Sequence, residues 1–153
     1  MARLPRTLVV VLALVAVVVL AASASAMGTG ANVIGKGRLV YTPDGEATVF
    51  GTDLRPGARI TISGRATLTP TCVVLPRRKP CFKVDPRTGA TVVLRPIRFL
   101  IEGTAFRVVL VSNASFAVGL SGAGKLALDG RGTYTVDGVA RPYRGRRTLH
   151  LAS

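Results

Sequence analysis

Residues 59–68 read Arg-Ile-Thr-Ile-Ser-Gly-Arg-Ala-Thr-Leu, and this stretch decides the fold class. Apolar or small residues occupy every even position, and all the polar side chains fall on odd positions. Such alternation places one face of a strand against a core and the other in water, which is typical of antiparallel sheets. Gly64 and Ala66 indicate that the strand bends there, or that something packs closely against that face.

The same period of two recurs along the chain, and no stretch after residue 26 has a convincing helical period. Ser112-Asn113-Ala114 is interpreted as a turn that joins two of these alternating segments. The further inward-facing sets are Phe106-Val108-Leu110, Phe116-Val118-Leu120, Tyr134 with Val136, and Leu149 with Leu151.

Turn-forming residues separate the alternating runs at intervals typical of short strands. The pattern therefore predicts an all-β protein, an antiparallel β-sandwich or small β-barrel of about eight to ten short strands. No βαβ pattern is present, so a parallel α/β fold is not expected. The predicted turns are Pro43-Asp44-Gly45, Arg55-Pro56-Gly57, Asp85-Pro86-Arg87-Thr88-Gly89, Asp129-Gly130 and Asp137-Gly138.

A faint internal similarity links Gly35-Lys36-Gly37-Arg38-Leu39 with Gly122-Ala123-Gly124-Lys125-Leu126. Two distant copies do not make a repeat array. We interpret them as equivalent strands of a two-sheet fold, with glycine where backbones approach closely.

Residues 1–26 are predicted to be a signal peptide. Arg3 and Arg6 precede an apolar run from Leu8 to Ala22, and Ala24-Ser25-Ala26 provides a small-residue cleavage site. We therefore expect one secreted β domain, residues 27–153, in an extracytoplasmic and bacterial setting. The alternative is an uncleaved segment that holds the protein to the membrane, although a spanning helix needs about 20 apolar residues.

The chain is strongly basic, with a net charge of +14 that falls to +12 once Arg3 and Arg6 are removed. Such a surface attracts polyanions, namely anionic lipid head groups, acidic wall polymers or nucleic acid. The arginine excess is equally consistent with GC-rich coding, because the chain is also rich in Ala, Gly and Val. No recognition helix or aromatic stacking platform is visible, so sequence-specific nucleic-acid binding is not expected.

Cys72 and Cys81 are the only cysteines, and in an exported protein this closely spaced pair predicts a disulfide. Between them, Arg77, Arg78 and Lys79 lie between two prolines, which restrict the loop and lower the entropy lost on binding. A second basic cluster lies near the C-terminus, and both clusters are candidate polyanion-binding sites. Its candidate residues are Arg144, Arg146 and Arg147, beside Arg141.

The chain does not carry a recognisable catalytic or cofactor motif. Residues 119–126 resemble a phosphate-binding loop, but Leu126 stands where a Ser or Thr hydroxyl must bind magnesium. The only histidine, His150, is expected to face outward, and two cysteines with one distant histidine cannot form a zinc site. Neither a metal nor a small-molecule cofactor is expected, and we do not expect an enzyme.

The sequence favours a binding module for anionic envelope polymers or membrane surfaces, and it identifies no protein partner. A structural or protein-interaction module of the cell envelope is the alternative, and an exposed apolar surface would favour it. A second alternative is an envelope hydrolase with an unrecognised carboxylate site, which two acidic residues facing each other in one pocket would favour.

Overall fold

A computed structural model describes residues 30–73 and 79–152, so the predicted signal peptide 1–26 lies outside the described range. Every regular element in that range is a strand, and none of it forms a helix that could span a membrane. The strands are β1 (Gly30–Pro43), β2 (Glu46–Leu54), β3 (Arg59–Cys72), β4 (Phe82–Val84), β5 (Thr91–Val93), β6 (Ile97–Ser121), β7 (Gly124–Val136) and β8 (Val139–Leu151).

All eight strands belong to one antiparallel sheet with the order β4-β5-β3-β6-β1-β7-β8, and β2 pairs with β6. The sheet is not closed, because β4 and β8 are the two ends of the hydrogen-bonded path. This confirms the predicted all-β, antiparallel class with eight strands. The barrel alternative is not adopted.

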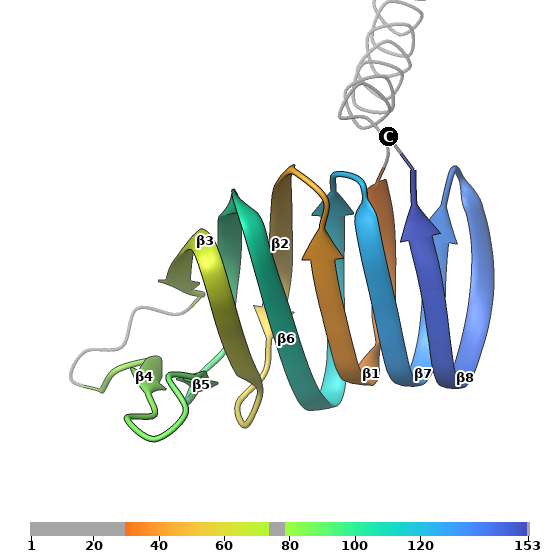
Figure 1. The fold of residues 1–153 in the computed structure, drawn as a ribbon. Coiled ribbons are helices and arrows are strands. Elements are labelled where there is room, and N and C mark those ends of the chain that lie inside the picture. The colour runs from red at the N-terminus through yellow and green to blue at the C-terminus, as the bar shows by residue number, and fades with distance from the viewer. Residues whose placement is uncertain (1–29, 74–78, 153) are drawn as a thin grey trace, which may run out of the picture.

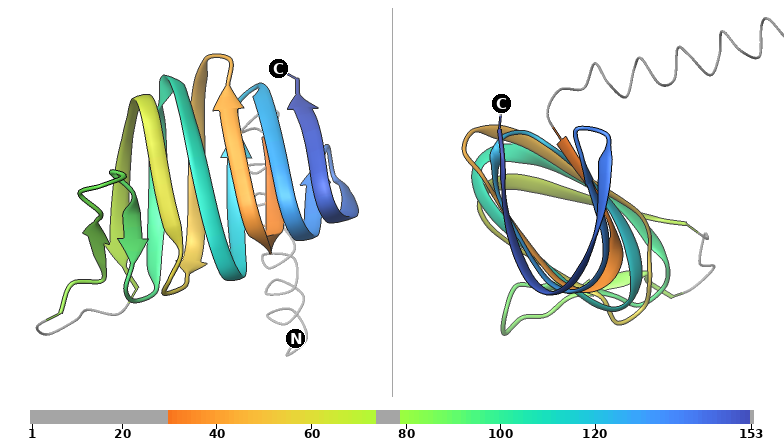
Figure 2. Two further views of the ribbon diagram at one scale, coloured as in Figure 1. Left: turned by 60° about the horizontal axis from the view of Figure 1, so that its bottom comes forward. Right: turned by 90° about the vertical axis from the view of Figure 1, so that its right-hand side faces the viewer.

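The long strands bend, so that the single sheet folds over itself into two facing layers (Figures 1 and 2). β6 has 25 residues and bends twice, and β2 pairs with both its first stretch (97–104) and its last (117–121). β1, β7 and β8 bend once each, along the lower edge of the view in Figure 1. The strands are thus longer than expected, since one strand contributes to both layers.

The core lies between the two layers and is made by the inward positions of the alternating pattern. Phe106, Val108 and Leu110 face it from one stretch of β6, and Phe116, Val118 and Leu120 face it from the next. Tyr134 and Leu151 are also buried, as predicted, and Leu149 and Val136 pack against the core. The inward and outward faces were therefore predictable from the period of two.

Two predicted turns are wrong, because the chain bends there without leaving the sheet. Residues 112–114 and 129–130 lie inside β6 and β7, at the lower folded edge. Small and polar residues such as Ser, Asn and Gly suit a bend within a strand as well as a turn between strands. The turns predicted at 43–45, 55–57, 85–89 and 137–138 do connect consecutive strands.

Gly37 illustrates why the lower bend requires glycine. Its φ of 111° lies in the region that side chains avoid, and a Cβ there would come within 2.2 Å of the Asp129 carbonyl oxygen. At the upper edge, the pairing of β3 with β6 shifts register between Gly64 and Arg65, where a bend was predicted.

The predicted disulfide is confirmed. Cys72 and Cys81 are bonded, with their Cα atoms 5.9 Å apart, and Cys81 is buried in the core. The bond ties the end of β3 to the residue before β4, and so anchors the small β4–β5 hairpin to one end of the sheet.

Candidate functional site

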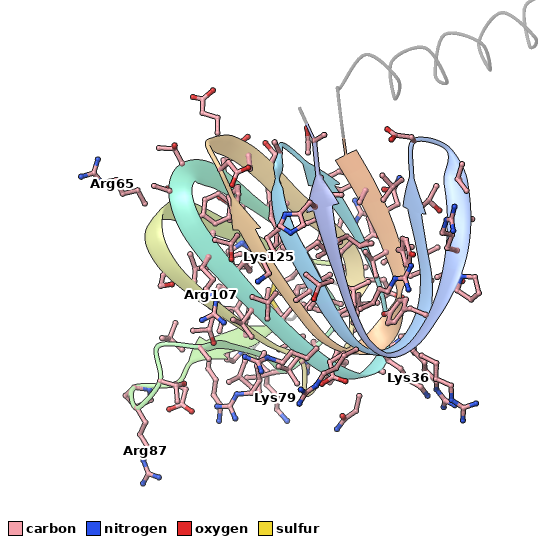
Figure 3. All side chains as sticks on the ribbon, turned by 45° about the vertical axis from the view of Figure 1, so that its right-hand side comes forward. Lys36, Arg65, Lys79, Arg87, Arg107 and Lys125 are labelled. Carbon is pink, nitrogen blue, oxygen red and sulfur yellow. A yellow bond between two sulfur atoms is a disulfide. The ribbon has the colours of Figure 1, made fainter. Side chains whose placement is uncertain are left out.

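The two predicted basic clusters lie at opposite ends of the sheet. Lys79 is exposed just before β4, whereas the second cluster lies on β8 (Figures 1 and 3). Arg77 and Arg78 lie outside the described residues, so their part in a site stays a prediction. A single patch that joins Lys79 with the arginines of β8 is not formed.

The β8 arginines do not all face the same way. Arg144 and Arg146 are exposed and alternate with the buried Tyr143 and the bend residue Gly145. The guanidinium of Arg147 instead lies 5.9 Å from the centre of the Tyr134 ring, a cation–π contact. Arg144 and Arg146 therefore belong to the outer surface, and Arg147 covers an aromatic side chain.

Arg144 joins two cations that sequence reasoning missed. Lys36 of β1 is directly opposite Arg131 of β7, and Arg131 is directly opposite Arg144 of β8. We call Lys36, Arg131 and Arg144 the cationic row. It crosses three adjacent strands at the lower bend, where Figure 3 shows Lys36.

The sequence does contain a signal for the cationic row. Lys36 and Arg131 each lie between two glycines, in Gly35-Lys36-Gly37 and Gly130-Arg131-Gly132. These two triplets pair residue for residue in the sheet. The similarity that we noted, with Gly122-Ala123-Gly124, does not reveal this pairing, because the upper end of β7 pairs with Thr42 and Pro43.

The cationic row forms no ion pair with any described residue. Among the residues that the structure describes, three ion pairs are present elsewhere, and each neutralises an aspartate. These pairs are Arg55–Asp53 at 3.7 Å, Arg146–Asp129 at 3.6 Å, and Arg59–Asp85. Like charges directly opposite each other destabilise a sheet, so the row is a local electrostatic cost that a bound anion would offset.

A shallow depression of about 410 Å³ adjoins the cationic row. It is lined by all three cations, together with Gly37, Gly130, Ser112 and Asn113. A second depression of about 510 Å³ lies on the other side of Arg131 and Arg144. No described carboxylate lines either depression.

Tyr143 supports the bend from inside. Its side chain is buried beside Tyr134, with the ring centres 6.3 Å apart, and burial raises the pKa of its hydroxyl. The hydroxyl lies so close to Gly35 that a Cβ at that glycine would be 2.3 Å from it. The row is therefore carried on a packed support rather than on a loop.

A second groove, of about 780 Å³, lies at the upper edge and has a different character. Glu46 and Glu102 both line it, with Arg65 and several hydroxyl side chains. The two glutamates are diagonal neighbours on β2 and β6, because Glu46 is opposite Thr104 and Glu102 is opposite Thr48. Their Cβ atoms should be about 7 Å apart, and no aromatic side chain lines the groove.

The remaining predicted positions are ordinary surface positions. His150 is exposed on β8 opposite Lys125, as its place in the alternation predicted. Within residues 30–73 and 79–152, no group of three or more His, Cys, Asp or Glu side chains is arranged to hold a metal ion.

No protein-family model, curated protein or solved structure matches the chain, so its function must be inferred from its own residues.

Proposed function

We propose that this protein is an exported binding module for anionic envelope polymers or anionic membrane surfaces, and that the cationic row is its principal contact. The single observation that supports the proposal most is the alignment of Lys36, Arg131 and Arg144 on adjacent strands without a described carboxylate partner. A domain that needed only solubility would gain nothing from placing like charges directly opposite each other.

Arginine and lysine are suited to this role in different ways. A guanidinium offers a planar fork of donors that matches phosphate or carboxylate oxygens, and an ammonium acts as a point charge. The row presents two forks and one point charge. The predicted basic loop, Arg77, Arg78 and Lys79, is a separate contact in this proposal, because Lys79 lies at the other end of the sheet from Arg144.

Salt dependence is the expected signature of such binding. Three phosphate contacts should release counterions with a slope of about −2 to −3 in log K against log salt. Between 50 and 200 mM salt the affinity should therefore fall by about 16- to 64-fold.

The test is co-sedimentation of the exported protein with purified envelope material and with anionic vesicles across a salt series. The variant Lys36→Ser/Arg131→Ser/Arg144→Ser should lose most of the binding. A control with the same charge change, Arg65→Ser/Arg87→Ser/Arg98→Ser, should lose little. A separate triple change of Arg77, Arg78 and Lys79 to Ser measures the contribution of the basic loop. Equal losses in the row variant and the control would reduce the proposal to bulk charge, and absence of binding at low salt would refute it.

A second candidate is an envelope hydrolase that uses Glu46 and Glu102, because the two carboxylates line one groove. It ranks lower because both side chains are exposed and the groove has no aromatic wall on which a sugar could stack. Loss of polymer hydrolysis in Glu46→Gln and Glu102→Gln, with intact binding by the cationic row, would favour it.

A protein-interaction role is the third candidate. Phe50 and Leu100 are opposite each other on β2 and β6, and both are exposed, as is Ile34 on β1. Phe50 and Leu100 form a small apolar pair, and Ile34 lies two strands away from Phe50. Large exposed apolar patches are the usual mark of protein interfaces. A change of all three to Ser that abolished an interaction, with polyanion binding unchanged, would support it.

A further inference from the structure

We infer that the depression beside the cationic row is a site for one phosphoryl group, so that the ligand is a phosphate-bearing polymer or a phospholipid head group rather than a polycarboxylate. This inference rests on the proposed function and narrows it to one ligand chemistry.

The charged residues around the depression come from three adjacent strands. Lys36, Arg131 and Arg144 stand on adjacent strands that should be about 4.8 Å apart, so their charged groups can converge on one ligand. The strands also curve at this edge, because the chain passes from one layer to the other here (Figure 2). A tetrahedral phosphoryl group accepts hydrogen bonds from several directions, whereas a carboxylate has two oxygens and accepts them mainly near its own plane.

The two arginines are placed to act on the same group. Arg131 and Arg144 are direct cross-strand neighbours, and both line the depressions on either side of them. Two guanidinium forks side by side can each donate two hydrogen bonds to phosphoryl oxygens. Lys36 adds a third positive charge from β1.

The floor of the depression permits close approach. Gly37 and Gly130 line it and present backbone without a side chain. A Cβ at either position would lie 2.2 Å or less from a backbone oxygen of the neighbouring strand, so the bend keeps glycine there. With no side chain at these two positions, a ligand can approach the backbone of the sheet closely while the charged side chains bind it.

The far wall of the depression is held in place by a local hydrogen-bond pair. The Ser112 hydroxyl donates to the Ala114 carbonyl at 2.8 Å, and the Ala114 N–H donates to the Ser112 hydroxyl oxygen at 3.3 Å. These bonds fix the bend of β6 and leave the exposed Asn113 between the two residues. Asn113 lines the depression, so its neutral side-chain amide adds a hydrogen-bonding group to that wall.

The test is a two-dimensional NMR titration of the exported protein with inorganic phosphate and, separately, with acetate. Phosphate should produce saturable shifts of the amide signals of Gly37, Gly130 and Asn113, and acetate should not. The variant Arg131→Lys/Arg144→Lys keeps the charge but removes both forks, and it should weaken phosphate binding by about tenfold. The matched control Arg38→Lys/Arg146→Lys lies two residues away on β1 and β8 and should leave phosphate binding unchanged. Equal shifts with acetate, or unchanged phosphate affinity in Arg131→Lys/Arg144→Lys, would overturn the inference.

Sedimentation with three larger probes separates this inference from the proposed function. Polyphosphate and phosphatidylglycerol vesicles should bind more strongly than polyglutamate at equal charge concentration. The stronger of the two phosphate probes identifies the source of the phosphoryl group, and preference for either supports the inference. Equal binding to polyglutamate would overturn the inference and leave the proposed function intact, whereas binding to none of the three would overturn both.

Discussion

Two rows of side chains cross the same three strands two residues apart, and they differ in the charge of their central residue. The cationic row places Arg131 of β7 between Lys36 and Arg144. The other row, which we call the mixed row, places Asp129 of β7 between Arg38 and Arg146. The strands and their pairing are the same in both rows, so the central residue on β7 makes the difference.

The mixed row places one negative side chain between two positive ones, whereas the cationic row contains only positive side chains. Asp129 pairs with Arg146 at 3.6 Å and stands directly opposite Arg38, so attraction offsets most of the repulsion. The exposed pair itself contributes less than about 1 kcal/mol. In the cationic row, both contacts of Arg131 are with like charges. The sheet therefore tolerates both the cationic row and the mixed row at this edge, and only the cationic row would gain stability from a bound anion.

The largest expected effect comes from breaking the bend that supports both rows. Gly35→Ala would place a methyl group 2.3 Å from the Tyr143 hydroxyl and 2.5 Å from the Arg131 carbonyl oxygen. We expect the free energy of unfolding to fall by about 3 kcal/mol, measured by urea denaturation. Gly45→Ala is the control, since nothing lies near a Cβ there, and it should change stability by less than about 0.5 kcal/mol. A loss below 1 kcal/mol in Gly35→Ala would show that the bend is not tightly packed.

Alkaline pH should act on the tyrosines beneath the two edges. Burial, and next the nearby Asp44 charge, raise the pKa of Tyr41 to about 12, and its hydroxyl donates to the Gly122 carbonyl at 2.6 Å under the upper edge. The folded pKa of Tyr41 exceeds the unfolded value of 10. The protonated hydroxyl therefore contributes to folding stability fully below pH 10, and this contribution is lost as pH rises through about 12. This contribution of the Tyr41 hydroxyl amounts to about 3 kcal/mol.

Tyr41 and Tyr143 can be separated by substitution. Tyr41→Phe should remove most of the fall in the free energy of unfolding between pH 10 and pH 12, measured by chemical denaturation. Burial also raises the pKa of Tyr143 under the cationic row, so Tyr143→Phe should remove a part of the same loss. An unchanged pH profile in Tyr41→Phe would contradict this assignment.

Arg131→Asp converts the cationic row into a copy of the mixed row. We expect affinity for anionic vesicles or polyphosphate at low salt to fall by about tenfold, because the central fork is replaced by a carboxylate. Unfolding should at the same time become harder by about 0.5 kcal/mol, since two repulsive contacts become attractive. Arg65→Asp carries the same charge change at the upper edge and should alter neither quantity as much. Lower stability in Arg131→Asp would mean that the row is not a local cost.

Asp129→Arg makes the opposite conversion and should have the smallest effect on binding. The mixed row would become a second cationic row, and polyanion affinity should rise by about threefold. The free energy of unfolding should fall by about 1 kcal/mol, because the pair with Arg146 is lost and like charges face each other. Glu102→Arg serves as the control for the change in net charge. A rise in affinity as large in Glu102→Arg would indicate bulk attraction rather than a site.

The fold was predictable to the extent that alternation reveals which side chains face inward. Phe106 and Leu128 are buried, and their neighbours in sequence are exposed or half-buried. This alternation can be recognised without a structure. What alternation does not reveal is whether Asp129-Gly130 ends a strand or bends it. That depends on the neighbouring strands, which continue the hydrogen bonding across the bend.

The candidate site was predictable only in part, because it is defined by register between strands. Arg144 and Arg146 stood out as members of a basic cluster, but sequence proximity grouped them with Arg147, which instead covers Tyr134. Lys36 lies 95 residues before Arg131, and only the pairing of β1 with β7 brings them together. Registers of this kind follow from core packing across the whole sheet and not from any local pattern.

The open end of the sheet gives the cationic row a further property. β8 is the last strand of the hydrogen-bonded path, and it contributes one residue, Arg144, to the cationic row. Any strand added beside it would place one more side chain on that edge, about 4.8 Å further along. Each strand that the row crosses thus adds one side chain to the row. Its length and charge can be changed by adding a strand or exchanging a single residue, while the core between the layers stays as it is.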